Sequence, residues 1–214
     1  EWVFLLFINL SASSLSPLTM IKAVIEEACI QPEAIGGVAV SSGPGSFTGL
    51  RIGMSTAKTL AQVWGVPVVG VGTLDALAHP LKGLANLVCP ILNARKNEVY
   101  AAVYDGADGD MKNLTGSLAI NPVELAGVLA RWGDRPVTFL GDGVSEYRDR
   151  LIELLGKRVF FAPGAVSLPR GSSIAEIGWE RLAGGQGTDP LTLLPDYVRL
   201  SEAEIKWQQK QQTT

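Results

Sequence analysis

The stretch SSGPGSFTGLRIG, residues 41–53, carries the strongest structural signal in the chain. It follows an apolar run, residues 37–41, that predicts a buried strand, and it opens an amphipathic helix predicted over residues 47–64. Glycine permits a tight turn and the close approach of another backbone, and Ser46 is of the type that caps a helix start. The free N–H groups at such a start can hold an anion. The stretch therefore predicts a strand–turn–helix unit whose turn either binds phosphate or simply packs tightly.

Two common phosphate-binding patterns do not fit this turn. A Walker A loop needs Gly-Lys-Ser/Thr, but Gly49 is followed by Leu50 and Arg51. A dinucleotide fingerprint needs a third glycine at the position of Thr48. Spacing alone favours the tight turn, and the residues that would line an anion site are Gly43, Pro44, Gly45, Ser46, Thr48, Gly49 and Arg51.

Strand-like and helical patterns alternate on both sides of this unit. A strand is predicted at residues 2–8, and a helix at residues 17–30 has Ser16 as its cap and Pro17 in its first turn. The remaining predictions are strands at 67–71, 87–93, 98–104, 137–140 and 159–161 and helices at 74–78, 122–132, 146–155 and 172–183. This order predicts a layered α/β fold. A seam near residues 82–86 divides it into an N-terminal lobe, 1–86, and a C-terminal lobe, 87–214.

Composition excludes several kinds of protein. The 214 residues are 47% hydrophobic with a net charge of −3, which argues for a packed core and against unaided binding to nucleic acid. Residues 2–8 form an apolar run too short to span a membrane. Cys29 and Cys89 are expected to be buried free thiols, which favours a reducing cytoplasm. His79 is the single histidine and is expected at the surface or at a helix end, so little material remains for a metal site.

Gly49, Gly53 and Ala57 recur at every fourth position of the helix at 47–64. Small residues in such a row let another helix approach closely. The row is therefore either packed inside the domain or is a surface for a partner, and the sequence leaves both open.

The motifs GPGSFTGLRIG (43–53), AKTLA (57–61), PVVGVGTLDALA (67–78), ILNARKNEVYAAVYD (91–105) and LPDYVRL (194–200) resemble the bacterial TsaB (YeaZ-type) family. The resemblance implies an actin-like ASKHA fold with two α/β lobes. It also implies a non-catalytic subunit for making threonylcarbamoyladenosine beside the tRNA anticodon, in the cytoplasm, with a TsaD-like catalytic partner and a TsaE-like ATPase. Such a chain meets tRNA only through the complex, forms a homodimer in isolation and has no cofactor of its own, with room for a nucleotide at the complex interface.

The resemblance also assigns the docking surface to the two helices at 17–30 and 47–64. The residues expected to meet the partner, or a second copy, are Leu18, Ile21, Ile25, Leu50, Gly53, Met54 and Ala57. Met54→Glu or Ala57→Glu is then expected to abolish pairing with little change in fold. Neither catalytic nor metal-ligating residues are expected, because a chain with one histidine cannot contain the HxxxH motif of TsaD.

The chain departs from the family pattern in two places. Family members carry a β-hairpin after the first strand, but here only a few residues separate Asn9 from Ser16. Either the hairpin is deleted or it is missing from this sequence, and we expect the second because its loss would expose a sheet edge. Asn93 replaces an aspartate that is frequent in the family, which weakens any catalytic role for that strand end.

An alternative function is a small-molecule kinase or ATPase of the same superfold. It would use Gly43–Gly49 as a phosphate loop and bind Mg²⁺ through carboxylates, for which Asp75, Glu98, Asp105 and Asp142 are available. A protease is disfavoured because His79 would have to be its sole base.

Overall fold

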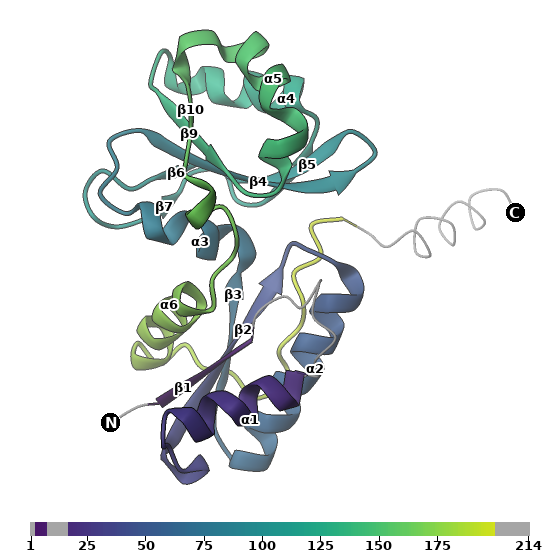
Figure 1. The fold of residues 1–214 in the computed structure, drawn as a ribbon, viewed down its shortest axis with the longest axis vertical. Helices are drawn as coiled ribbons and strands as arrows, with labels where there is room; N and C mark the ends of the chain where they lie inside the picture. The colour runs from purple at the N-terminus through teal and green to yellow at the C-terminus, as the bar shows by residue number, and fades with distance from the viewer. Residues whose placement is uncertain (1–2, 8–16, 200–214) are drawn as a thin grey trace, which may run out of the picture.

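The computed structural model describes residues 3–7 and 17–199, arranged as two α/β lobes (Figure 1). The segment between Asn9 and Ser16, where the sequence departs from its family, lies outside the described residues. Within the described part of the chain, none of the helices has the length and apolar character needed to cross a membrane.

The first lobe is a parallel sheet with helices on both faces. Its strands lie in the order β1-β2-β3, and the elements are β1 (Val3–Phe7), β2 (Ile35–Gly43), β3 (Val68–Gly72), α1 (Pro17–Glu27), the short helix η1 (Pro32–Ala34) and α2 (Phe47–Trp64). Side chains alternate across β2, because successive residues of a strand point to opposite faces. Val38 and Val40 therefore pack with α1 and α2, whereas Ala39 packs with α6 (Gly171–Ala183) on the other face.

The second lobe has a mixed sheet in the order β10-β9-β4-β5-β8, with β6 and β7 paired beside β4. Its strands are β4 (Leu87–Arg95), β5 (Glu98–Ala101), β6 (Tyr104–Asp105), β7 (Lys112–Asn113), β8 (Leu118–Ile120), β9 (Val137–Leu140) and β10 (Val159–Phe161). Its helices are α4 (Pro122–Leu129), η3 (Ala130–Trp132), α5 (Gly143–Leu155), η4 (Gly156–Arg158) and η5 (Gly164–Val166). The helices α4 and α5 pack on one face around Phe139, and the other face is covered by α3 (Thr73–Ala78), which is followed by η2 (His79–Leu81).

The predicted C-terminal lobe, residues 87–214, includes a segment that belongs to the first lobe, so this part of the predicted division is wrong. The chain enters the second lobe near residue 87 as expected, but it returns to the first lobe before its end, and α6 packs on β1, β2 and β3 (Figure 1). The return is possible because Gly178 has no side chain: an added Cβ would collide with Ala39 of the sheet. Ile174 and Ile177 then fill the core on this face.

Most elements lie where periodicity predicts them, and the exceptions are local. The predicted strand at 98–104 ends at Ala101, and α5 begins three residues earlier than expected. Cys29 is exposed rather than buried, whereas Cys89 is buried as predicted, and burial raises the pKa of its thiol far above the usual range. His79 lies at a helix end but is buried, with Nε2 2.9 Å from an oxygen of Glu176 on α6.

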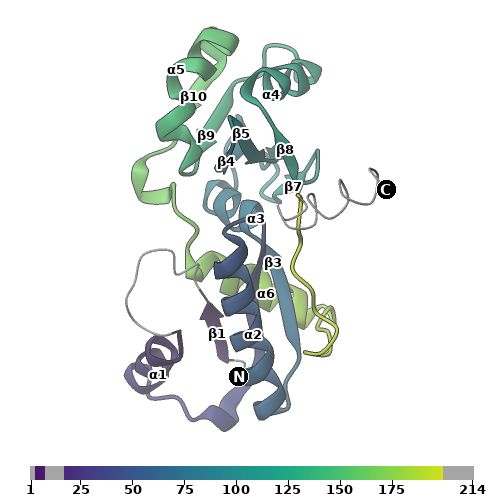
Figure 2. The same cartoon turned by 90° about the vertical axis from the view of Figure 1, so that its right-hand side faces the viewer.

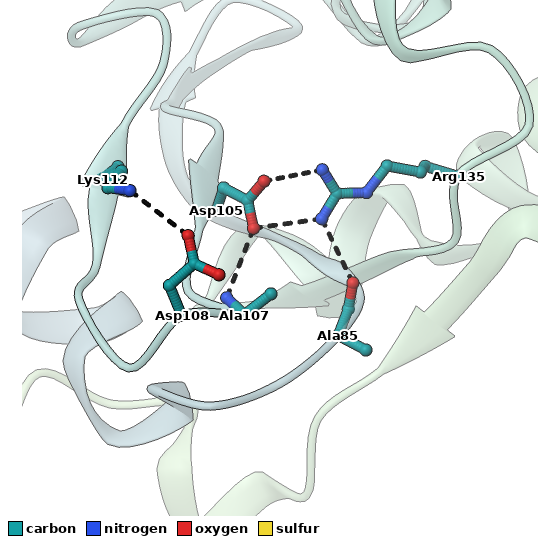
Figure 3. A network of polar contacts seen from close by, with 6 residues as sticks. All are labelled: Ala85, Asp105, Ala107, Asp108, Lys112 and Arg135. Carbon is teal, nitrogen blue, oxygen red and sulfur yellow. Dashed lines mark hydrogen bonds and ion pairs between the residues drawn. The ribbon is translucent and has the colours of Figure 1, made fainter.

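An arginine clamp fixes the entry to the second lobe (Figure 3). Arg135 donates two hydrogen bonds to the carboxylate of Asp105, at 2.7 and 3.0 Å, and one to the carbonyl of Ala85 at 3.2 Å. The guanidinium holds the pKa of Asp105 below its usual value, mainly through these hydrogen bonds. The clamp therefore ties the crossing between the lobes to β6 and to the start of β9.

Candidate functional site

The glycine loop, residues 43–46, joins β2 to α2 at the carboxyl end of the first sheet. Ser46 caps the helix, and its Oγ accepts a hydrogen bond from the N–H of Gly49 at 3.3 Å. Gly43 has φ +117°, a conformation that favours glycine, and a Cβ there would lie 2.6 Å from the carbonyl oxygen of Asp196. The loop is therefore shaped to receive a distant segment of its own chain.

That segment, residues 188–199, is here called the strap. It pairs with β3 through Thr188 and Val68 and then runs beside α2 toward the second lobe (Figure 1). Lys58 of α2 donates hydrogen bonds to the carbonyls of Leu191 and Leu193, at 3.3 and 2.9 Å. The N–H of Asp196 donates to the carbonyl of Ser42 at 2.7 Å. The strap therefore packs against the first residues of the turn, Ser42 and Gly43, whereas Ser46 and Thr48 at the start of α2 remain exposed.

An aromatic clasp closes the strap over the first turn of α2. The rings of Phe47 and Tyr197 lie 5.1 Å apart, and the Arg51 guanidinium stacks 3.9 Å from the centre of the Phe47 ring. Nε of Arg51 also donates to the Tyr197 hydroxyl at 3.1 Å. Two residues further on, Arg199 pairs with Glu98 of β5 at 2.9 Å, so that the strap reaches the second lobe.

The matching turn of the second lobe, between β9 and α5, is acidic. The carboxylate of Asp142 accepts from the backbone N–H of Asn93 at 2.9 Å, and Glu146 accepts from the Asn93 side-chain amide. The helix dipole stabilises these two carboxylates at the N-terminus of α5. Their negative charge would repel a phosphate group from this helix end. Asn93 therefore joins β4 to the start of α5 through its backbone and its side chain.

The predicted docking residues divide between the inside and the outside of the first lobe. Leu18 is 54% exposed and Gly53 is half-buried with open space where its Cβ would be, whereas Ile25 is partly buried against the core. Ile21, Leu50, Met54 and Ala57 are buried within the chain itself. Their burial argues against direct contact with a partner, because Ile21, Met54 and Ala57 pack in the core that α1 and α2 form with their own sheet, and Leu50 packs toward Gly43.

Three faces of α2 can be followed from three successive residues. Leu50 points to the core, Arg51 to the strap, and Ile52, 51% exposed, to solvent. Each face continues at helical spacing: Leu50 with Met54, Arg51 with Lys58, and Ile52 with Val63, which is 74% exposed. The row of Gly49, Gly53 and Ala57 is likewise split, because Ala57 packs inside and Gly53 is open. The exposed docking face, as used below, consists of Leu18, Ile52, Gly53 and Val63.

The carboxylates available to the kinase alternative are all engaged by other side chains or backbone. Asp75 accepts from the Tyr104 hydroxyl at 2.7 Å and lies 3.3 Å from Arg181, and burial, followed by this carboxylate, raises the Tyr104 pKa well above its usual range. Asp105, Asp142 and Glu98 are held as described above. No group of three or more His, Cys, Asp or Glu side chains suited to a metal occurs within residues 3–7 and 17–199.

The strap is the part of this arrangement that local periodicity does not predict. The motif LPDYVRL (194–200) contributes to the family resemblance, but nothing in the sequence places it against the glycine loop. The structure brings three separate motifs together: the glycine loop, the β4–β5 hairpin and the strap.

The fold and this inter-lobe arrangement define an α/β protein with the two-lobed, actin-like ASKHA fold. A family model described as "TsaD: tRNA N6-adenosine threonylcarbamoyltransferase" matches residues 12–207. The Bacillus subtilis "tRNA threonylcarbamoyladenosine biosynthesis protein TsaB" is 32% identical over 198 residues, covering 92% of this chain and 84% of that protein. The chain belongs to the TsaB (YeaZ) family.

Other relatives agree. The Escherichia coli TsaB protein is 37% identical over 89 residues, which are 41% of this chain and 38% of that protein. A crystal structure from Pseudomonas aeruginosa, described as similar to peptidase YEAZ, superposes with a TM-score of 0.75 at 25% identity. It covers 88% of this chain and 85% of that one. A second structure, "YeaZ from Pseudomonas aeruginosa", gives a TM-score of 0.72 at 26% identity, with 85% and 82% covered.

Proposed function

We propose that this chain takes part in tRNA threonylcarbamoyladenosine biosynthesis as a non-catalytic subunit that docks a TsaD-type catalytic partner. The names of its relatives in Bacillus subtilis and Escherichia coli support the pathway. The exposed docking face of α1 and α2 carries the proposal for the mode of action, because Ile52 and Val63 remain in solvent after the core stripe and the strap side of α2 are satisfied.

The open space at Gly53 supports the same face. A helical glycine costs about 0.5–1 kcal/mol relative to alanine, and nothing within 4 Å of its Cβ position requires it inside the chain. A glycine beside an exposed apolar residue, as Gly53 is beside Ile52, allows the backbone of a second helix to approach closely. The docking partner is therefore a helical surface, either that of a TsaD-type protein or, in isolation, that of a second copy.

Absence of a reaction centre of its own is the second part of the proposal. The strap occupies the space beside Gly43, the second lobe's turn carries two carboxylates, and the candidate magnesium ligands are engaged by neighbouring groups. These contacts favour a binding role over the kinase or ATPase alternative. A TsaE-type ATPase, tRNA and a nucleotide then join at the assembled complex in the cytoplasm, and the isolated chain has no cofactor.

Reconstitution tests this function. Purified TsaD-type and TsaE-type proteins of the same cell are mixed with tRNA, threonine, bicarbonate, Mg-ATP and the enzyme that makes the threonylcarbamoyl donor, with and without this chain. Modified adenosine is expected only when the chain is present, and the chain alone is expected to produce none. Formation of the product by the chain alone, or full activity without it, would contradict the proposal.

A matched pair of variants locates the docking face. Ile52→Glu places a charge on the exposed docking face of α2, and Ile152→Glu places one on α5, where the isoleucine is 44% exposed. Only the first is expected to prevent co-elution with the TsaD-type partner, while both keep the wild-type unfolding midpoint.

Calorimetric titration of the isolated chain with Mg-ATP tests the alternative function, since micromolar binding would favour a kinase or ATPase.

A further inference from the structure

The strap links parts of the molecule that are far apart in the sequence. Its Asp196 N–H is bonded to Ser42 before the glycine loop, and its Arg199 reaches Glu98 at the hairpin of the second lobe. Between these contacts, Tyr197 lies in the clasp with the first turn of α2. Twelve residues therefore connect the docking helix to the other lobe.

The two ends of the strap are held unequally. At the first lobe, Thr188 and Val68 exchange backbone hydrogen bonds at 2.9 and 3.1 Å, and Lys58 of α2 holds two further carbonyls. At the second lobe, the contact is the Arg199–Glu98 pair, whose side chains are 27% and 35% exposed. An ion pair this exposed changes an equilibrium by at most about fivefold, so this end can open and close reversibly.

We propose that the strap is a latch between the lobes that controls the docking face, an inference that rests on the proposed function. In the closed state, the Arg199–Glu98 pair holds the strap against the glycine loop, and the clasp then fixes the first turn of α2. In the open state, Arg51 loses its hydrogen bond to Tyr197, and the turn that carries Ile52 loses a support. A partner that binds the fixed turn shifts the equilibrium toward the closed latch, and closing the latch raises the affinity for the partner by the same factor.

Side-chain geometry explains why the control passes through this turn. Arg51 and Ile52 are neighbours on α2, yet one faces the strap and the other faces solvent. Gly43 lets the strap backbone approach until the Asp196 carbonyl would lie 2.6 Å from an added Cβ. Movement of the strap is therefore transmitted to the glycine loop by backbone contact and to the first turn of α2 by the clasp.

Charge reversal tests the latch in the full chain. Glu98→Arg and Arg199→Glu each replace the attraction with repulsion, and the double variant restores an ion pair of opposite sense. Glu153→Arg is the control, because it breaks an exposed pair within α5, Arg150–Glu153 at 2.8 Å, that does not connect the lobes. Hydrogen–deuterium exchange of the Asp196 amide is measured for all of them.

Each single reversal is expected to speed exchange of that amide roughly threefold or more, and the double variant to return it to the wild-type rate. Unchanged exchange in the single variants, or no recovery in the double variant, would overturn the latch.

Affinity for the TsaD-type partner is measured on the same proteins and is expected to fall and recover in parallel. If exchange responds but affinity does not, control of the docking face is overturned while the proposed function stands. If wild-type chain does not bind the partner, the proposed function fails, and the exchange data still decide the latch.

Discussion

The two lobes use the same local unit, a glycine-bearing turn from a parallel strand into a helix, in different ways. In the second lobe, the turn before α5 packs directly on the backbone of its own sheet: a Cβ on Gly141 would collide with the carbonyl of Ile91. In the first lobe, the turn before α2 packs on the strap, a segment from the far end of the described chain.

The second lobe is built from one continuous stretch of the chain, whereas the first lobe also needs segments that follow the second lobe in the sequence. The second lobe runs continuously from α3 to β10, whereas the first needs α6 to cover its sheet and the strap to pack against its glycine loop. The first lobe also keeps two apolar side chains of α2, Ile52 and Val63, in solvent.

Gly141→Ala is expected to lower the free energy of unfolding most, because this turn packs against backbone that cannot move aside. Gly141 has φ +104°, and its neighbour is the rigid backbone of β4. Backbone strain and the collision together are expected to lower the free energy of unfolding by about 3–5 kcal/mol. Urea denaturation followed by circular dichroism measures it, and a loss below about 1 kcal/mol would show that this turn yields as easily as the other.

Gly43→Ala is expected to be milder and to act on the strap. The residue has φ +117°, but the atom in the way belongs to the strap, which can move aside. We expect a loss of about 1–3 kcal/mol in the free energy of unfolding. Faster exchange of the Asp196 amide is expected with it. A fully protected Asp196 amide in this variant would mean that the strap is not the neighbour that gives way.

Asp105→Asn tests the clamp of the second lobe and carries a pH signature. The variant loses charge-assisted hydrogen bonds to Arg135, for an expected cost of about 1–2 kcal/mol at pH 7. Because folding lowers the pKa of this carboxyl, the wild-type advantage is complete above about pH 4, the unfolded value, and disappears as the pH falls through the folded pKa. Denaturation of both proteins between pH 7 and pH 2.5 checks this, and a constant difference across that range would contradict it.

The sequence predicted local structure better than it predicted contacts between distant segments. Helix α2 has the predicted bounds, because its apolar spacing, the Ser46 cap and Gly65 after its end are all local signals. The return of α6 to the first lobe depends on the fit of Gly178 against Ala39, which no periodicity reveals.

The orientation of α2 was the harder part of the site to predict. The helix has one apolar stripe, through Leu50, Met54, Ala57 and Ala61, and an outer face on which Ile52 and Val63 are separated by Thr56 and Thr59. The polar residues Arg51 and Lys58 are explained only once the strap lies beside them. The prediction chose the apolar stripe for the partner, and Met54→Glu would in fact place a carboxylate in the core.

The most direct test of the docking face is a calorimetric titration of the TsaD-type partner into Gly53→Gln, with Gly127→Gln as the matched control. Both glycines lie in helices with nothing within 4 Å of their Cβ positions, Gly53 on α2 and Gly127 on α4 of the second lobe. If the partner packs on α2, Gly53→Gln weakens binding at least about tenfold, a cost of about 1.4 kcal/mol. The control is then expected to bind like wild type, and neither variant is expected to have a lowered unfolding midpoint. Equal affinity of the Gly53→Gln variant and wild type would contradict the account.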